Sequence, residues 1–144
     1  MFSKILVPVD GSEISYKALE TALFLAGKLG SNITVMHVME DIPVTYIESQ
    51  KLLKTLTEIS MVCKKQGQDI LSKCSEIATQ KGLNIKTLLF EGNPASVILD
   101  YTLKEEHDFI IMGRRGMGKF KELFLGSVSS KVLHHSTCPV MIIR

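Results

Sequence analysis

The 144-residue chain lacks the features that would place it in a membrane or in a disulfide-stapled class. No apolar run approaches the ~18 residues that a membrane-spanning helix needs. The short apolar run at the start leads to Pro8 and Asp10 rather than to a cleavage signal. The three cysteines are an odd number and match no metal-site spacing: Cys63, Cys74 and Cys138. These absences predict a cytoplasmic protein with reduced thiols and no membrane partner.

The sequence also lacks a dominant charge. Its 17 basic and 15 acidic residues leave a formal net charge of +2, so a general affinity for nucleic acid or another polyanion is not indicated. Apolar residues make up 45% and charged residues 22% of the chain, which is an ordinary globular mixture. There is no low-complexity tract or internal repeat, and 144 residues suit one domain spanning 1–144.

What the chain does contain is a regular alternation of short apolar runs and longer helical patterns. The apolar runs predict strands, and apolar residues at helical spacing predict helices. Ser12 and Asn93 are expected N-caps, Pro94 opens a helix and Gly30 ends one. The predicted strands are 4–9, 32–38, 84–91, 108–112 and 138–144, and the predicted helices are 12–30, 48–81, 92–106 and 126–135.

The second helical pattern, 48–81, carries one apolar stripe that includes Cys63, Ile70 and Cys74. Because both cysteines lie on this stripe, we expect them to fill the core rather than to sense redox state. Gly67 lies inside the pattern and leaves a bend open as an alternative to one continuous helix.

Strand–helix alternation with nearly continuous apolar strands predicts an α/β fold, with a parallel sheet covered by helices on both faces. The third strand contains Lys86 and Thr87, which suits a position near the sheet edge. Ligands of such sheets bind beyond the carboxyl ends of the strands, where the strand order reverses. Two strand ends, at "VDGS" and "GRRGMGKF", carry the most glycine and polar content. We therefore expect a doubly wound, Rossmann-like, five-stranded sheet of order 3-2-1-4-5.

The stretch "GRRGMGKF" is nearly a P-loop, G-x-x-x-x-G-K-[ST]. Gly113, Gly118 and Lys119 fit that pattern, but Phe120 stands where a hydroxyl would bind Mg²⁺. The better helix start also lies six residues later, at Gly126. A working P-loop is therefore not expected.

A second pattern, G-x2-G-x9-G-S, fits the same region through Gly113, Gly116, Gly126 and Ser127. The first two glycines would let backbone N–H groups approach an anion. Gly126 and Ser127 open a helix whose free N–H groups and dipole favour phosphate, and the hydroxyls of Ser127 and Ser129 could donate to it. A plain turn remains the structural alternative. Four basic side chains nearby could instead belong to an ordinary solvated surface: Arg114, Arg115, Lys119 and Lys121.

Asp10 ends the first strand and has two compatible roles. A carboxylate there can cap the following helix, or it can accept from ribose hydroxyls or hold Mg²⁺. Because it would repel phosphates, the ribose end suits it better than the phosphate end. The four histidines show no partner spacing, and no Ser/His/Asp or Cys/His grouping indicates a nucleophilic site.

These motifs resemble the single-domain, nucleotide-binding branch of the universal stress protein family. The resemblance rests on "KILVPVDGSEIS", "EGNPASVI" and "DFIIMGRRGMGKFKELFLGSVSSKVLHHSTCPVMIIR", and covers nearly the whole chain except 39–60. It implies ATP as ligand, with AMP or ADP also possible, and Mg²⁺ arriving with the nucleotide.

The resemblance also implies a site and an assembly. The backbone of Pro8, Val9 and Val38 would hold adenine, and Asp10 would contact the ribose or a phosphate-bound metal. Met112 belongs to the same site, although packing is its simpler role. The phosphates would be lined by Gly113, Arg115, Gly116, Gly126, Ser127, Val128 and Ser129. A homodimer would form through the last strand, Pro139 to Ile143, which otherwise leaves an exposed edge.

Three functions follow as hypotheses. The first is a cytoplasmic ATP-binding stress-response protein whose nucleotide state is read by protein partners. The second is a slow ATPase or a phosphoryl- or adenylyl-transfer enzyme that uses the same site. Catalysis needs a placed base or a water-orienting group, and none is visible in the loops. The third is a protein that binds no nucleotide, either a purely structural dimer or a binder of other ligands.

Overall fold

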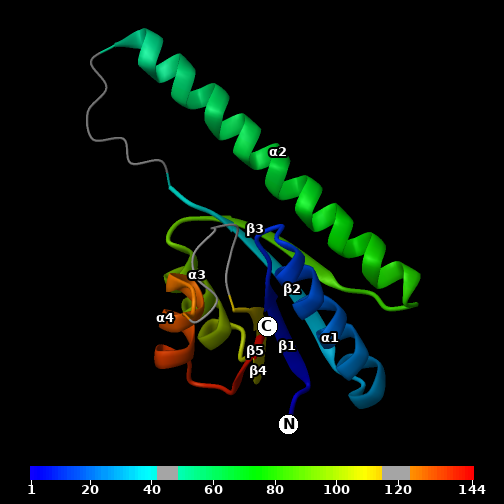
Figure 1. Cartoon of the computed structure of the whole chain (residues 1–144). Coiled ribbons are helices and arrows are strands. Elements are labelled where there is room, and N and C mark those ends of the chain that lie inside the picture. The colour runs from blue at the N-terminus through cyan, green and yellow to red at the C-terminus, as the bar shows by residue number, and fades with distance from the viewer. Residues whose placement is uncertain (42–48, 115–123) are drawn as a thin grey trace.

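The computed structural model describes residues 1–41, 49–114 and 124–144. In this part of the chain, five parallel strands form one sheet of order β3-β2-β1-β4-β5 (Figure 1). The predicted strand order is thereby confirmed, and β3 lies at an edge as its polar residues indicated. The strands are β1 Lys4–Pro8, β2 Asn32–Met39, β3 Lys86–Glu91, β4 Phe109–Gly113 and β5 Val140–Ile143.

Helices cover both faces of the sheet, which confirms the doubly wound architecture. Helices α1 (Glu13–Leu29) and α2 (Gln50–Gln80) pack on one face, and α3 (Pro94–Lys104) and α4 (Ser127–His135) pack on the other. None of the helices in the described residues is both long enough and apolar enough to cross a membrane.

The two-faced burial explains why the central strands read as unbroken apolar runs. Ile5 and Val7 point into the core under α1 and α2, whereas Leu6 between them points into the core under α3 and α4. All three side chains are fully buried. A strand with helices on both sides has no solvent-facing positions, so it shows no polar alternation.

The helix ends form where the sequence predicts them. The Ser12 hydroxyl accepts from the N–H of Ser15 at 3.2 Å, and Asn93 Oδ1 accepts from the N–H of Ser96 at 3.1 Å. Gly30 closes α1 in the left-handed conformation with φ of 72°. The two N-caps fix where α1 and α3 begin at the carboxyl edge of the sheet.

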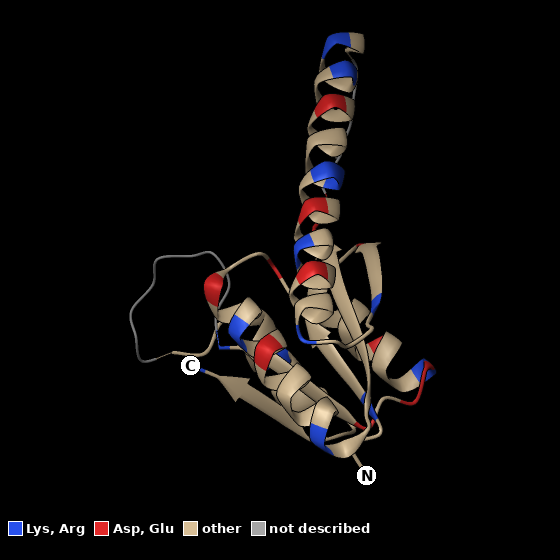
Figure 2. Ribbon diagram, turned by 90° about the vertical axis from the view of Figure 1, so that its right-hand side faces the viewer, with Lys and Arg blue, Asp and Glu red and all other residues tan. Residues whose placement is uncertain are grey.

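Helix α2 is continuous over 31 residues, so Gly67 does not bend it. Gly67 instead permits close packing: a Cβ there would lie 2.7 Å from Leu89 Cδ1 and 3.0 Å from His37 Cδ2. Only the second half of α2 lies on the sheet, and the first half projects beyond it (Figure 2). The predicted apolar stripe is therefore exposed at its start, where Leu52 and Ile59 are 47% and 44% accessible.

Candidate functional site

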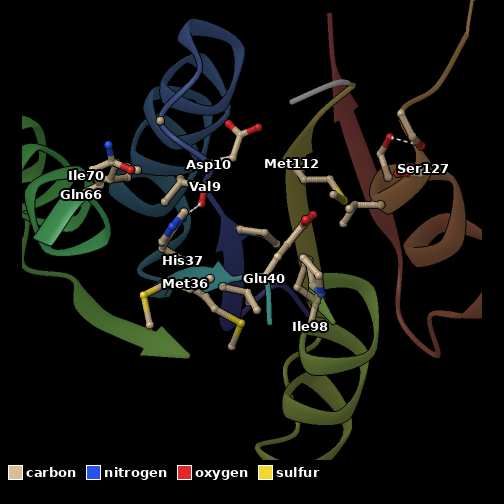
Figure 3. Close-up of a pocket in the computed structure, with 18 of the residues that line it drawn as sticks. Val9, Asp10, Met36, His37, Glu40, Gln66, Ile70, Ile98, Met112 and Ser127 are labelled. Carbon is tan, nitrogen blue, oxygen red and sulfur yellow. Dashed lines mark hydrogen bonds between the residues drawn. The ribbon is translucent and has the colours of Figure 1, made fainter. Parts of the chain in front are cut away.

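A cleft of about 1010 Å³ opens at the carboxyl ends of β1, β2 and β4. Strand β1 pairs with β2 on one side and with β4 on the other, so the cleft lies where the strand order reverses. Helix α2 forms one wall, and α3 and α4 form the other (Figure 3). Nine residues of the predicted site line it together: Pro8, Val9, Asp10, Val38, Met112, Gly126, Ser127, Val128 and Ser129.

Of the three other predicted site residues, the structure describes Gly113. Gly113 is the buried last residue of β4 and is not among the cleft-lining residues. A Cβ on it would lie 2.9 Å from Ile14 Cγ2, so glycine is needed there for the packing of α1. Arg115 and Gly116 lie outside the described residues, as do Gly118 to Lys121. A contact between these residues and phosphate stays a prediction.

Asp10 shapes the turn between β1 and α1. Its Oδ1 accepts from the N–H of Ser12 at 3.0 Å and from the Ser12 hydroxyl at 2.5 Å. Gly11 between them has φ of 85°, a conformation that favours glycine. Asp10 thus supports the N-cap residue of α1, Ser12, instead of capping the helix itself as the capping interpretation expected, and its carboxylate also lies at the cleft. One of its two oxygens is engaged in the turn, which leaves the other for a ligand.

The hydrogen-bond ladder between β1 and β2 stops inside the cleft. The carbonyl of Met36 accepts from the N–H of Val9 at 2.8 Å. The next ladder bond would join the N–H of Val38 to the carbonyl of Val9, but the register ends at Pro8 opposite Met36. The Val9 carbonyl instead lies 2.8 Å from Nδ1 of His37. Because a carbonyl oxygen only accepts, Nδ1 carries the proton.

The backbone groups of Val9 and Val38, both predicted to hold a base, differ in whether they are open to a ligand. The N–H and carbonyl of Val9 are both engaged within the protein. Backbone groups of alternate residues point to the same side of a strand, so Val38 directs its N–H and carbonyl as Met36 does. At Val38, β1 offers no ladder partner. Val38 therefore presents one donor and one acceptor beside the end of β1.

The first turn of α4 forms the opposite end of the cleft. Its N-cap is Gly126, which has no side chain to cap the helix. The N–H of Gly126 donates to the carbonyl of Arg114 at 2.8 Å. The N–H groups of Ser127, Val128 and Ser129 belong to the first turn, where an α-helix supplies no internal acceptor. An anion at this end of the cleft would meet these three donors and the positive end of the helix dipole.

The hydroxyl of Ser129 has a different task from the one its position in the motif indicated. It donates to the carbonyl of Arg114 at 2.6 Å, and Ser129 is 2% accessible. The hydroxyl also lies 3.1 Å from the carbonyl of Gly126, so its single proton is used within the protein, where the shorter bond holds α4 to the residue that follows β4. The hydroxyl of Ser127 remains the better placed of the two for a ligand, because Ser127 is exposed.

A family model described as the universal stress protein family matches residues 1–144. The chain belongs to the universal stress protein family. It is 38% identical over 148 residues to universal stress protein YxiE of Bacillus subtilis, with both chains fully covered. The solved structure of universal stress protein UspA from Lactobacillus plantarum matches with a TM-score of 0.86 and 29% identity, covering 99% of this chain and 98% of that one.

A third comparison concerns a ligand-bound relative. A universal stress protein family protein of Arabidopsis thaliana, solved with AMP bound, matches with a TM-score of 0.70 and 24% identity. The match covers 98% of this chain and 90% of that chain. At that identity the likeness shows the shared fold.

Three acidic residues line the cleft of this universal stress protein, whereas the sequence indicated only Asp10: they are Asp10, Glu40 and Asp69. Glu40 follows β2 directly and lines the cleft with Asp10 (Figure 3). The sequence favoured the loops after β1 and β4 over the loop after β2, because those two carry the most glycine and polar residues. The rule that ligands bind at strand ends would have found Glu40, since β2 borders β1 at the point of reversal.

The sequence also did not indicate that α2 contributes to the site. Cys63, Gln66 and Ile70 line the cleft from this helix. Cys63 was expected in the core, but it is only half-buried, because it lies beyond the part of α2 that packs on the sheet. Cys74 is fully buried as expected, and burial raises the pKa of its thiol to about 11.

Proposed function

We propose that this universal stress protein binds an adenine nucleotide in the cleft and acts as a nucleotide-dependent binding or signalling module in the cytoplasm. ATP is the proposed ligand, with ADP or AMP as the alternative nucleotides. The observation that carries the proposal is the order of the chemical groups along the cleft. Uncapped helix N–H groups lie at one end, carboxylates lie near its middle, and an open strand edge lies at the other.

The base, the ribose and the phosphates of a nucleotide each have a complementary group along the cleft. The N–H and carbonyl of Val38 complement a purine edge that offers one acceptor and one donor. The carboxylates of Asp10 and Glu40 accept from ribose hydroxyls. The first turn of α4 suits the phosphates through its N–H groups and its dipole. The AMP-bound relative with the same fold is consistent with this assignment.

Magnesium is proposed to arrive with the nucleotide. No cluster of three or more His, Cys, Asp or Glu side chains able to hold a metal occurs among the described residues. A cation would therefore be held mainly by phosphate oxygens and water, and the second oxygen of Asp10 would bind it only in place of a ribose hydroxyl. There it would neutralise phosphate charge beside the carboxylates.

Replacement of Ser127 by proline tests the phosphate end directly. Proline is tolerated at the first helical position, and Pro94 already occupies that position in α3. The preceding Gly126 has φ of −63° and ψ of 159°, which a residue before proline adopts readily. Ser127→Pro therefore removes one N–H donor and the hydroxyl but keeps α4. Ser127→Ala removes the hydroxyl alone and serves as the matched control.

We expect calorimetric titration of nucleotide-free protein to show ATP binding. Ser127→Pro should weaken ATP binding roughly tenfold relative to Ser127→Ala, because a hydrogen bond to a charged group contributes about 1.5 kcal/mol or more. Mass spectrometry of the denatured protein should show which nucleotide co-purifies. A wild-type protein that binds neither ATP nor AMP would contradict the proposal.

We further propose a homodimer formed through β5 and the preceding residue, Pro139 to Ile143. Strand β5 pairs with β4 on one side and ends the sheet on the other within the described residues. Its four residues are partly accessible and apolar, and an open apolar edge favours pairing with its own copy across a two-fold axis. Sedimentation at micromolar concentration should give a dimer, and a monomer there would contradict this proposal.

A further inference from the structure

Helix α2 supplies a wall of the cleft that the contacts proposed above do not use. Cys63, Gln66 and Ile70 are spaced i, i+3 and i+7, so they lie on one stripe of the helix. Figure 3 shows Gln66 and Ile70 on the side of the cleft that holds His37, across from Met112 and Ser127. The base end of the cleft is therefore bounded by α2.

Two close contacts on α2 hold this wall in place. At Gly67 the helix approaches the sheet so closely that a Cβ would lie 2.7 Å from Leu89 Cδ1. One turn further on, Ile70 Cδ1 lies 2.9 Å from the position of a Cβ on Gly11. Gln66 immediately precedes the first contact and lies one turn before the second. Its backbone is therefore fixed relative to both β3 and the turn after β1.

Gln66 is the neutral polar group of this wall. Its side chain is exposed and makes no hydrogen bond within the described part of the chain. Asp69 lines the same wall but lies 3.4 Å from the ammonium of Lys65, in an ion pair along the helix. A carboxamide offers a donor and an acceptor at once. Gln66 therefore has both functions available to a ligand.

The base proposed for this cleft leaves a complementary pair of groups unused. When the N–H and carbonyl of Val38 engage N1 and one N6 hydrogen of adenine, N7 and the second N6 hydrogen remain. A glutamine carboxamide matches N6 and N7 of adenine with two hydrogen bonds, whereas guanine presents two acceptors there. Resting on the proposed function, we infer that Gln66 recognises the N6/N7 edge of the bound adenine and determines base specificity.

The test compares ATP with 7-deaza-ATP, which lacks the N7 acceptor, by calorimetric titration of the full chain. The wild-type protein should bind 7-deaza-ATP about tenfold more weakly than ATP, as expected for the loss of one base contact. Gln66→Ala should bind ATP about tenfold more weakly than wild type and should no longer distinguish the two ligands. Gln68→Ala, an exposed glutamine on the same helix but not in the cleft, should behave as wild type.

A second measurement reports on the wall without a substitution. Saturating ATP should slow alkylation of Cys63, identified by peptide mass spectrometry, and should leave alkylation of Cys138 unchanged because Cys138 does not line the cleft. If the wild-type protein binds ATP and Gln66→Ala binds it as tightly as Gln68→Ala does, this inference is wrong but the proposed function stands. Unchanged alkylation of Cys63 would also overturn the inference. Failure of the wild-type protein to bind ATP would overturn the proposed function and, with it, this inference.

Discussion

Nδ1 of His37 lies 2.8 Å from the carbonyl oxygen of Val9, and this side-chain bond takes the place of the next ladder bond between β1 and β2. One contact thus ends the strand pairing and leaves the backbone of Val38 open to the cleft. His37 also lies beneath Gly67 of α2. The ring therefore connects the two strand ends to the helix that borders them.

Removal of the His37 ring should weaken both the fold and the site. His37→Ala leaves the Val9 carbonyl without its donor, so the free energy of unfolding should fall by about 1 kcal/mol or more. ATP affinity should fall as well, since the end of β1 loses its support. His37→Asn retains an N–H near the position of Nδ1 and should recover part of both losses.

Urea unfolding and calorimetry measure these effects, and His134→Ala is the control. Nδ1 of His134 also lies near a backbone carbonyl, that of Ser130 at 2.7 Å, but the residue is exposed. Its replacement should change stability by less than about 0.5 kcal/mol. Equal, small effects at both histidines would contradict the role given to His37.

Two helical glycines should respond in opposite directions to alanine. Gly27 in α1 has open space around a Cβ, so Gly27→Ala should stabilise the protein by about 0.5 to 1 kcal/mol through helix propensity. Gly67→Ala gains the same propensity but forces a Cβ against Leu89 and the hydrogen-bonded ring of His37. Overpacking costs about 1 to 3 kcal/mol, so Gly67→Ala should be destabilised. Chemical denaturation of both variants decides, and a stabilised Gly67→Ala would show that α2 can move away.

The hydroxyls of Ser129 and Ser130, two neighbouring residues of α4, should differ in their contribution to stability. Ser129→Ala breaks the bond to the Arg114 carbonyl and should lower the free energy of unfolding by about 1 kcal/mol. Ser130→Ala removes a hydroxyl with no hydrogen bond in the described part of the chain and should be nearly neutral. Thermal and urea unfolding distinguish them. Similar values for the two variants would mean that the Ser129 bond does not anchor α4.

Stability should fall in mild acid because of His107. This residue is 8% accessible, and its Nδ1 has no hydrogen-bond partner within the described residues. Burial lowers the pKa of His107 below its ordinary 6.5; Lys4 and Lys86 lower it further, whereas Glu105 and Asp108 raise it. The unfolded chain therefore binds a proton first. The contribution of neutral His107 to the free energy of unfolding is fully present above pH 6.5, the ordinary pKa of histidine. It is lost as the pH falls toward the pKa of His107 in the folded protein.

The matched variants for this prediction are His107→Gln and His135→Gln. Unfolding in urea at a series of pH values should show a smaller acid loss for His107→Gln than for the wild-type protein. His135 is exposed, so His135→Gln should keep the wild-type dependence. An unchanged slope in His107→Gln would exclude this histidine as the source.

The fold could be predicted from the sequence because its signals are local. Ser12 and Asn93 cap the helices they precede, and the apolar runs around Ile5 and Ile110 are buried on both faces. The strand order followed from the two loop compositions at the ends of β1 and β4. Each of these inferences needs only neighbouring residues and general rules for parallel sheets.

The site could be predicted only in part because the rest depends on distant contacts. The hydroxyl of Ser129 could be placed at a helix start, but not its acceptor on Arg114. Gly67 resembles a helix breaker until Leu89 is known to lie against it. Gln66 faces the cleft because of how α2 crosses the sheet, and that crossing is set by contacts with β2 and β3 rather than by the helix sequence.

The position of β1 at the centre of the sheet has a consequence for synthesis of the protein. Ile5 pairs with Ile33 on one side and with Phe109 on the other. A nascent chain can complete the first pairing early, but the second edge of β1 stays open until β4 has left the ribosome. Chains that stop before β4 would carry an unpaired apolar strand through the middle of their core and would be prone to aggregation.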